Sequence, residues 1–176
     1  MKIIEDFKES PTIQGLLNIK LDIFQDYRGE IWTIYSDEFT RYKFVQDKIS
    51  ISRFGVLRGF HGDSQTAKLI TCLSGQFQLV VVDLRKNSKT YGNSEIFMLS
   101  DCEPRVVIVP EGCVNAHLCL SDQCIFFYKW TQGYRGPEAQ ITVAWNDLSI
   151  NAPWMIACPI VSDRDKAGIP SEGVYL

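Results

Sequence analysis

One short stretch of the chain combines the residue types needed to remove a proton from an anionic substrate. It spans Val56–Asp63, reads VLRGFHGD, and holds one of only two histidines in 176 residues. Histidine is easily poised as a base near neutral pH, and arginine binds phosphate or carboxylate in a bidentate manner. Flanking glycines let the backbone approach a ligand closely. The stretch predicts a base, His61, beside an anion-binding group, Arg58; the alternative is a strand end with a surface arginine and a hydrogen-bonded histidine.

Composition excludes several classes of protein. A length of 176 residues predicts one domain, residues 1–176, and the net charge of −3 comes from interspersed acids and bases without a basic run for nucleic acid. No span of about 18 apolar residues is present, so no membrane helix is expected. The N-terminus turns acidic at once and lacks the apolar core of a signal peptide. We therefore expect a cytoplasmic protein that binds neither nucleic acid nor membrane.

The cysteines fit the same compartment. None of the six forms a Cys-x-x-Cys pair, and three lie in apolar, strand-like runs. Reduced core thiols are expected from this context rather than disulfides. The six are Cys72, Cys102, Cys113, Cys119, Cys124 and Cys158.

The elements that must position the histidine are strands. Short segments rich in β-branched and aromatic residues alternate with turn residues, which predicts a β-sandwich or barrel. Helix signals are weak and limited to Asp37–Tyr42 and Asp163–Ala167, and the final residues 169–176 are expected to fray. The expected strands are Ile31–Tyr35, Ile49–Ser52, Lys68–Leu73, Phe77–Leu84, Glu95–Leu99, Arg105–Val109, His117–Leu120, Ile125–Trp130 and Ile141–Trp145.

An ordered set of motifs resembles the dTDP-4-dehydrorhamnose 3,5-epimerases and covers roughly residues 20–168. The resemblance implies an all-β, cupin-type jelly roll that forms a homodimer. It implies epimerisation at C3 and C5, beside the C4 ketone of a nucleotide-linked 4-keto-6-deoxy sugar, with no metal or organic cofactor. The motifs are Arg28–Glu30, Gln46-Asp47, Gly55–His61, Lys68-Leu69, Val82–Arg85, Pro110–Gly112, Tyr128-Lys129, Trp145–Asp147 and Ser162–Asp165.

The resemblance also implies roles for individual residues. His61 takes the place of the general base, Asp165 that of its partner, and Tyr134 that of the proton-donating tyrosine. Lys68 falls on a substrate-contacting position and is a suitable cation for the negative charge that develops on the C4 oxygen. Arg58 also falls on a substrate-contacting position of the family, and we expect further substrate contacts from Arg28 (across a dimer contact), Gln46, Asn115 and His117.

Three departures leave the exact substrate open. Thr33 stands where the rhamnose-pathway pattern has a glutamate, Asn115 stands where it has a histidine, and Gly62-Asp63 follows the catalytic histidine. The combination looks more like a side branch acting on 4-keto sugars of capsule and O-antigen pathways, including GDP-linked heptoses. The nucleotide base, the sugar and the choice between C3 alone and C3 with C5 stay open. His117 either faces the ligand or is a strand histidine bonded to the backbone.

Two other functions are compatible with a cupin. A metal-dependent cupin enzyme needs a cluster such as three histidines, or two histidines and a carboxylate, and this chain has only His61 and His117 with no His-x-His pair. A non-catalytic sugar-binding domain would have no use for a base with its own carboxylate partner. The residues thus favour an epimerase without a metal.

Overall fold

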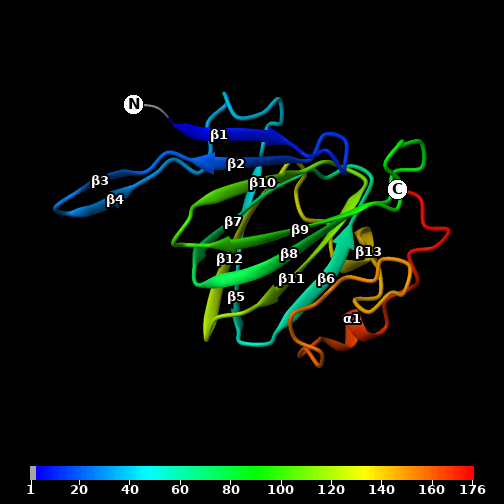
Figure 1. Cartoon of the computed structure of the whole chain (residues 1–176). Coiled ribbons are helices and arrows are strands. Elements are labelled where there is room, and N and C mark those ends of the chain that lie inside the picture. Colours follow the sequence, from blue (N-terminus) through cyan, green and yellow to red (C-terminus); the bar gives the residue numbers. More distant parts are fainter. Residues whose placement is uncertain (1–2) are drawn as a thin grey trace.

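The computed structural model describes residues 3–176, and strands make up almost all of its regular structure (Figure 1). A six-stranded antiparallel sheet has the order β1-β2-β10-β7-β12-β5, and a five-stranded antiparallel sheet has the order β13-β6-β11-β8-β9. The strands are β1 Ile4–Glu9, β2 Leu17–Leu21, β5 Gln46–Arg53, β6 Leu57–Gly62, β7 Lys68–Ser74, β8 Gln76–Asp83, β9 Ser94–Ser100, β10 Arg105–Val109, β11 Cys113–Cys119, β12 Gln123–Trp130 and β13 Ile141–Thr142.

A hairpin, the 3-10 helix η1 (Pro137–Ala139) and one α-helix lie outside these sheets. A hairpin of β3 (Phe24–Asp26) and β4 (Gly29–Ile31) projects away from the body of the molecule in Figure 1. The expected helix near residue 163 is confirmed as α1, Asp163–Lys166. Among residues 3–176, no helix has the length and apolar character that a membrane crossing requires.

The main core lies between the two large sheets, as the expected jelly roll requires. Inward side chains of β8 such as Phe77, Leu79 and Val81 are fully buried against β7, β10 and β12 residues, among them Ile70 and Val107. Alternation along a strand sends every second side chain to the same face, so one sheet supplies one half of this core and the facing sheet the other.

The strand β8 is buried on both faces. Val80 and Val82 point away from the main core and pack with Phe60, Ile150 and Trp154, so the segment after β13 covers the outer face of the five-stranded sheet. This explains why the sequence changes from alternation to a continuous apolar run within the strand.

A non-strand segment covers the outer face of the other sheet. The expected strand Ile31–Tyr35 is wrong: β4 ends at Ile31, and Trp32 and Ile34 instead pack with Phe39 against sheet residues such as Ile108. The segment 37–42, which was expected to be helical, forms turns and irregular backbone instead of a helix. The alternating apolar residues here hold a loop against a sheet. The same alternation is typical of a strand, so the sequence pattern alone does not distinguish the two.

The C-terminal segment is docked rather than frayed. Ser171 is buried and its N–H donates to Asp147 Oδ2 at 2.8 Å, while the N–H of Leu176 donates to the carbonyl of Leu84 at 2.8 Å. Asp147 also accepts from the N–H groups of Ser149 and Ile150, as expected for a turn aspartate.

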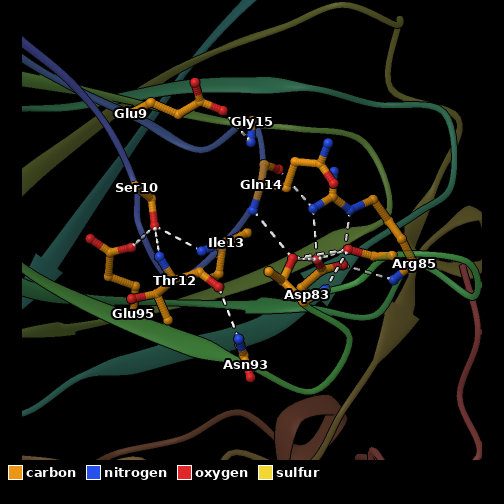
Figure 2. Close-up of polar contacts among 12 residues, drawn as sticks. Glu9, Ser10, Thr12, Ile13, Gln14, Gly15, Asp83, Arg85, Asn93 and Glu95 are labelled. Carbon is orange, nitrogen blue, oxygen red and sulfur yellow. Dashed lines mark hydrogen bonds and ion pairs between the residues drawn. The ribbon is translucent and has the colours of Figure 1, made fainter.

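A buried aspartate fixes the end of β8 to the first loop of the chain (Figure 2). Asp83 Oδ2 accepts hydrogen bonds of 2.6 Å each from Arg85, Ser88 and Thr90, and Arg85 donates onward to the carbonyl of Gln14 at 2.8 Å. Burial opposes ionisation of this carboxyl, but these donors outweigh it and lower the pKa of Asp83 to about 2. Asp83 and Arg85 are therefore part of the scaffold.

Candidate active site

A pocket of about 300 Å³ opens between the two sheets and contains most of the predicted site residues. It receives side chains from β5, β6, β7, β11 and β12, from the loop after β12 and from α1. Seven of the nine predicted residues line it: His61, Lys68, Asp165, Tyr134, Arg58, Asn115 and His117. The remaining lining residues are Lys48, Ser50, Phe126, Tyr128, Trp130, Gln140, Ser162 and Arg164.

His61 and Asp165 form a hydrogen-bonded pair at this pocket. His61 Nε2 lies 2.6 Å from Asp165 Oδ1, and the carboxylate is only 3% exposed. Burial opposes the ionised carboxylate, but the contact with His61 and the N-cap hydroxyl of Ser162 together lower the pKa of Asp165. An ionised carboxylate only accepts, so we assign the proton to Nε2, which leaves Nδ1 free to act as a base.

The backbone around Gly59 makes this pair possible. Asp165 Oδ2 accepts a hydrogen bond of 3.4 Å from the Gly59 N–H, and Gly59 has a φ of +120°. A Cβ at this position would lie 2.5 Å from the carbonyl oxygen of Asn115. Only glycine lets β6 approach β11 this closely, which places His61 beside the groups of β11.

Lys68 provides a buried cation beside the base. Its Nζ donates to the carbonyl oxygen of His61 at 2.8 Å and to Asn115 Oδ1 at 2.6 Å. Burial lowers the pKa of Lys68 to about 8, although the nearby charge of Asp63 works in the opposite direction. An ammonium has three donors, so one remains for a ligand. Asn115, one of the departures noted above, thus has a defined structural partner in Lys68.

His117 is enclosed by aromatic rings. It is 4% exposed, stacks on Phe126 with ring centroids 4.1 Å apart, and meets the edge of Phe77 at 5.5 Å. Its Nε2 is buried without a hydrogen-bond partner. Burial, reinforced by the charges of Arg58 and His61, lowers the pKa of His117 to about 3, so its imidazole is neutral. Because Nε2 of His117 makes no hydrogen bond to the backbone, the neutral imidazole at the pocket wall is compatible with a ligand contact.

We predict that His117 makes the protein sensitive to acid. The folded-state pKa of about 3 lies below the unfolded value of about 6.5, so the unfolded chain binds more protons between these values and stability falls as pH falls through this range. Between pH 7 and pH 5 the free energy of unfolding should fall by about 2 kcal/mol from this residue alone. Urea titrations of wild-type protein and His117→Phe at both pH values test this; equal pH dependence in the two proteins would contradict it.

Tyr134 lies at the rim, in the loop that follows β12. The residue is 43% exposed, and its backbone N–H donates to Gln46 Oε1 at 2.6 Å. Gln46 itself is not among the lining residues; it holds the loop that carries Tyr134. Lys48, two residues further along β5, places its Nζ 3.8 Å from the centroid of the Tyr134 ring.

Sequence reasoning missed Lys48, although a signal was present. Strand alternation puts Gln46, Lys48, Ser50 and Ser52 on one face of β5, and three of these four are polar groups with no charge. A lysine in that row, on the same face as a predicted site residue, could have been identified as a pocket residue.

The two arginines predicted to bind an anion lie in different places. Arg58 lines the pocket and its Nε donates to Ser52 Oγ at 3.0 Å. Arg28 lies in the β3–β4 turn, where it is exposed and pairs with Asp26 at 2.6 Å, and it does not line the pocket of its own chain.

The charge of the pocket suits an anion. Its lining contains four cationic side chains, Lys48, Arg58, Lys68 and Arg164, against one carboxylate, Asp165, which already has a partner. Among residues 3–176, no group of three or more His, Cys, Asp or Glu side chains is arranged to hold a metal ion. A larger hollow of about 760 Å³ lies near Phe39, Tyr42 and Arg85, but its lining has no histidine, so we place the chemistry in the smaller pocket.

Comparison with known proteins adds to this geometry. The sequence model of a family described as dTDP-4-dehydrorhamnose 3,5-epimerase matches residues 10–171. The dTDP-4-dehydrorhamnose 3,5-epimerase of Methanothermobacter thermautotrophicus is 36% identical, over 94% of this chain and 95% of its own length. The enzyme of the same name from Shigella flexneri is 33% identical, over 89% of this chain and 91% of its own length.

Solved structures agree with the sequence comparison. The crystal structure of dTDP-4-dehydrorhamnose 3,5-epimerase from Elizabethkingia anophelis superimposes with a TM-score of 0.87 at 33% identity, covering 97% of this chain and 98% of that one. The dTDP-6-deoxy-D-glucose-3,5-epimerase of Legionella pneumophila, solved in complex with dTDP-4-keto-L-rhamnose, gives 0.89 at 29% identity, covering 96% of this chain and 94% of that one. The similarity in fold therefore extends over almost the whole chain.

Proposed function

Because this chain belongs to the dTDP-4-dehydrorhamnose 3,5-epimerase family, we propose that its pocket inverts C3 and C5 of a nucleotide-diphosphate-linked 4-keto-6-deoxy sugar. The chain is an isomerase, and the reaction belongs to bacterial surface polysaccharide synthesis. One observation carries the assignment of the pocket: a histidine held by a buried carboxylate lies beside a buried lysine in a pocket rich in positive charge.

His61 is the general base. A proton beside a ketone is weakly acidic, so its removal must be coupled to stabilisation of the enolate oxygen that forms. Nδ1 of His61 accepts the proton while Asp165 holds Nε2–H and stabilises the imidazolium. The remaining donor of Lys68 faces the developing negative charge on the C4 oxygen, and burial of Lys68 strengthens this interaction.

Tyr134 is the proton donor for the opposite face of the sugar. His61 comes from β6 of the five-stranded sheet, whereas Tyr134 follows β12 of the six-stranded sheet. The two side chains therefore reach the pocket from its two walls, which is the arrangement that inversion requires. Removal on one face and delivery on the other changes the configuration at the carbon.

Arg58 and Arg28 bind the diphosphate, and a second copy of the chain supplies Arg28. The β3–β4 hairpin carries exposed Phe24 and Tyr27, and β5, the edge strand beside the pocket, exposes Ile49 and Ile51. An unpaired edge with exposed apolar side chains is a surface that another strand can cover. A homodimer in which the hairpin of one copy crosses β5 of the other would bring Arg28 to the pocket. Sedimentation analysis showing a monomer at working concentration would contradict this dimer.

We place the protein in the cytoplasm. All six cysteines are unpaired, including four buried ones, which fits a reducing compartment.

Replacing Asp165 with Asn is expected to lower turnover by at least tenfold. The amide can present a donor to His61 Nε2 and so favour the wrong tautomer, and it removes the charge that stabilises the imidazolium. Steady-state kinetics of Asp165→Asn and of Asp163→Asn, a change on the exposed face of the same helix, provide the test. Wild-type turnover in Asp165→Asn would show that His61 has another partner.

The function is tested with a panel of substrates. Purified protein is incubated with dTDP- and GDP-linked 4-keto-6-deoxy hexoses and heptoses, and proton couplings in the NMR spectrum report the configuration at C3 and C5. The expected result is inversion at both carbons for at least one substrate. Inversion at C3 alone would make the protein a 3-epimerase, and no inversion on any substrate would refute the proposal.

A further inference from the structure

The loop that carries Tyr134 is attached to the molecule by two side chains of β5. Residues 131–136 have no regular structure, and Tyr134 is 43% exposed, so local backbone geometry alone does not fix the position of its ring. Gln46 Oε1 accepts from the Tyr134 N–H at 2.6 Å, and Lys48 Nζ lies 3.8 Å from the ring centroid. Since Gln46 and Lys48 are two residues apart on one strand, they project from the same face. Gln46 holds the backbone of Tyr134, and Lys48 holds its ring.

Lys48 makes its contacts with aromatic rings instead of a carboxylate. Its Nζ also lies 4.5 Å from the ring centroid of Trp130 and 5.6 Å from that of Tyr128. The neighbouring carboxylate, Asp47, pairs instead with Lys129 at 2.6 Å. A cation held over ring faces without a competing carboxylate is where cation–π attraction has most effect.

Tyr134 has little else to hold it. Its ring meets the edge of Trp130 at 5.7 Å, and Trp130 is itself buried and fixed in β12. Lys48 lies against both rings, so its ammonium bridges a fixed ring and a loop ring. Removing the charge would leave one edge contact and one backbone hydrogen bond to orient the side chain.

We propose that Lys48 is a positioning residue that holds the ring of Tyr134 over the pocket for proton delivery. This inference rests on the proposed function, which assigns Tyr134 as the proton donor. Lys48 acts on the second half of the reaction, because removal of the first proton needs His61 and Lys68 but not the tyrosine.

The competing role for Lys48 is direct binding of the diphosphate. If Lys48 bound the diphosphate, its loss would weaken substrate binding. KM would then rise, and exchange and inversion would fall together. If Lys48 positions Tyr134, its loss affects the rate of proton exchange and the rate of inversion differently. Exchange of a substrate proton with solvent continues, while completion of inversion slows.

The test compares wild type with Lys48→Met, Lys48→Arg and Lys129→Met in heavy water. Methionine keeps an unbranched side chain without charge, arginine keeps the cation over the rings, and Lys129 is a matched lysine on β12 outside the pocket lining. We expect Lys48→Met to exchange within about twofold of wild type and to invert about 5- to 20-fold more slowly, with KM unchanged. Lys48→Arg and Lys129→Met should each keep the wild-type ratio of inversion to exchange. An unchanged ratio in Lys48→Met, or a raised KM with equal loss of both rates, overturns the proposal.

A second measurement does not depend on activity. With ¹³C-labelled tyrosine rings, the signal of Tyr134 is identified by its absence in Tyr134→Phe. In Lys48→Met this signal should move toward that of a solvent-exposed tyrosine, and in Lys48→Arg it should stay close to wild type. An unmoved signal in Lys48→Met overturns the positioning role, whereas wild-type protein that exchanges no proton of any 4-keto sugar would refute the proposed function instead.

Discussion

Replacing His61 with Asn is expected to lower turnover by about 10²- to 10⁴-fold while leaving the fold intact, because general-base catalysis contributes about that much. The amide of asparagine is shorter than the imidazole and does not reach the position of Nε2, but the buried carboxylate keeps its hydrogen bond from the Gly59 N–H. The loss should apply to both carbons, since the protons at C3 and C5 flank the same ketone and one base can serve each in turn. Steady-state kinetics on the active substrate, with circular dichroism and thermal unfolding as folding controls, measure the effect.

The control for this change is a second pocket residue with no proposed role in proton removal. Ser50 lines the same pocket, and Ser50→Ala removes only a hydroxyl that has no hydrogen-bond partner. It should keep at least a third of wild-type turnover. A His61→Asn variant with more than about half of wild-type turnover would exclude His61 as the base.

Replacing Tyr134 with Phe is expected to separate proton exchange from inversion. The enolate still forms, because His61 and Lys68 are unaffected, and a substrate proton is therefore still replaced by deuterium. Without the hydroxyl on the far wall, the enolate is reprotonated from the face that lost its proton, so at least one inversion should slow by about 10²-fold or more. Proton NMR in heavy water follows exchange through loss of signal and inversion through the appearance of the epimer.

The outcome for Tyr134→Phe discriminates between donors. Phenylalanine keeps the ring contacts with Trp130 and Lys48, so a change in position is not expected to confuse the result. Full double inversion at the wild-type rate would show that Tyr134 only covers the pocket and that the proton comes from elsewhere, with water as the next candidate.

The sequence predicted which residues gather in one pocket better than it predicted the edges of the fold. Residues such as His61 and Asp165 are 104 positions apart, and only the resemblance, not local pattern, predicted that they meet. Arg28 could not be placed in the same way, because its own chain leaves it exposed on a hairpin and a contact with a second copy is not encoded in local periodicity. Lys48 was missed although strand alternation places it on the same face as Gln46, because its ring partners lie on β12 and in the loop that follows it.

Local sequence patterns predicted the strands of the core and failed where tertiary contacts decide. Phe77–Leu84 and Ile125–Trp130 are rich in β-branched or aromatic residues and correspond to β8 and β12 within one or two residues. β1 and β2 were missed: β1 is largely exposed and mixes Glu, Asp and Lys with its apolar residues, and β2 is stabilised by its pairing with β10. The tail at 169–176 looks like a frayed end, yet Asp147 binds its backbone from 24 residues away.

We propose that His61 removes a proton beside the C4 ketone and that Tyr134 returns a proton on the opposite face. Proton NMR of the wild-type reaction in heavy water, with the nucleotide-linked 4-keto sugar that the panel identifies, tests this most directly. We expect that every inverted carbon carries solvent deuterium, that both C3 and C5 are labelled, and that His61→Asn labels neither within the same time. An epimer that retains the original substrate protons at the inverted carbons would contradict it.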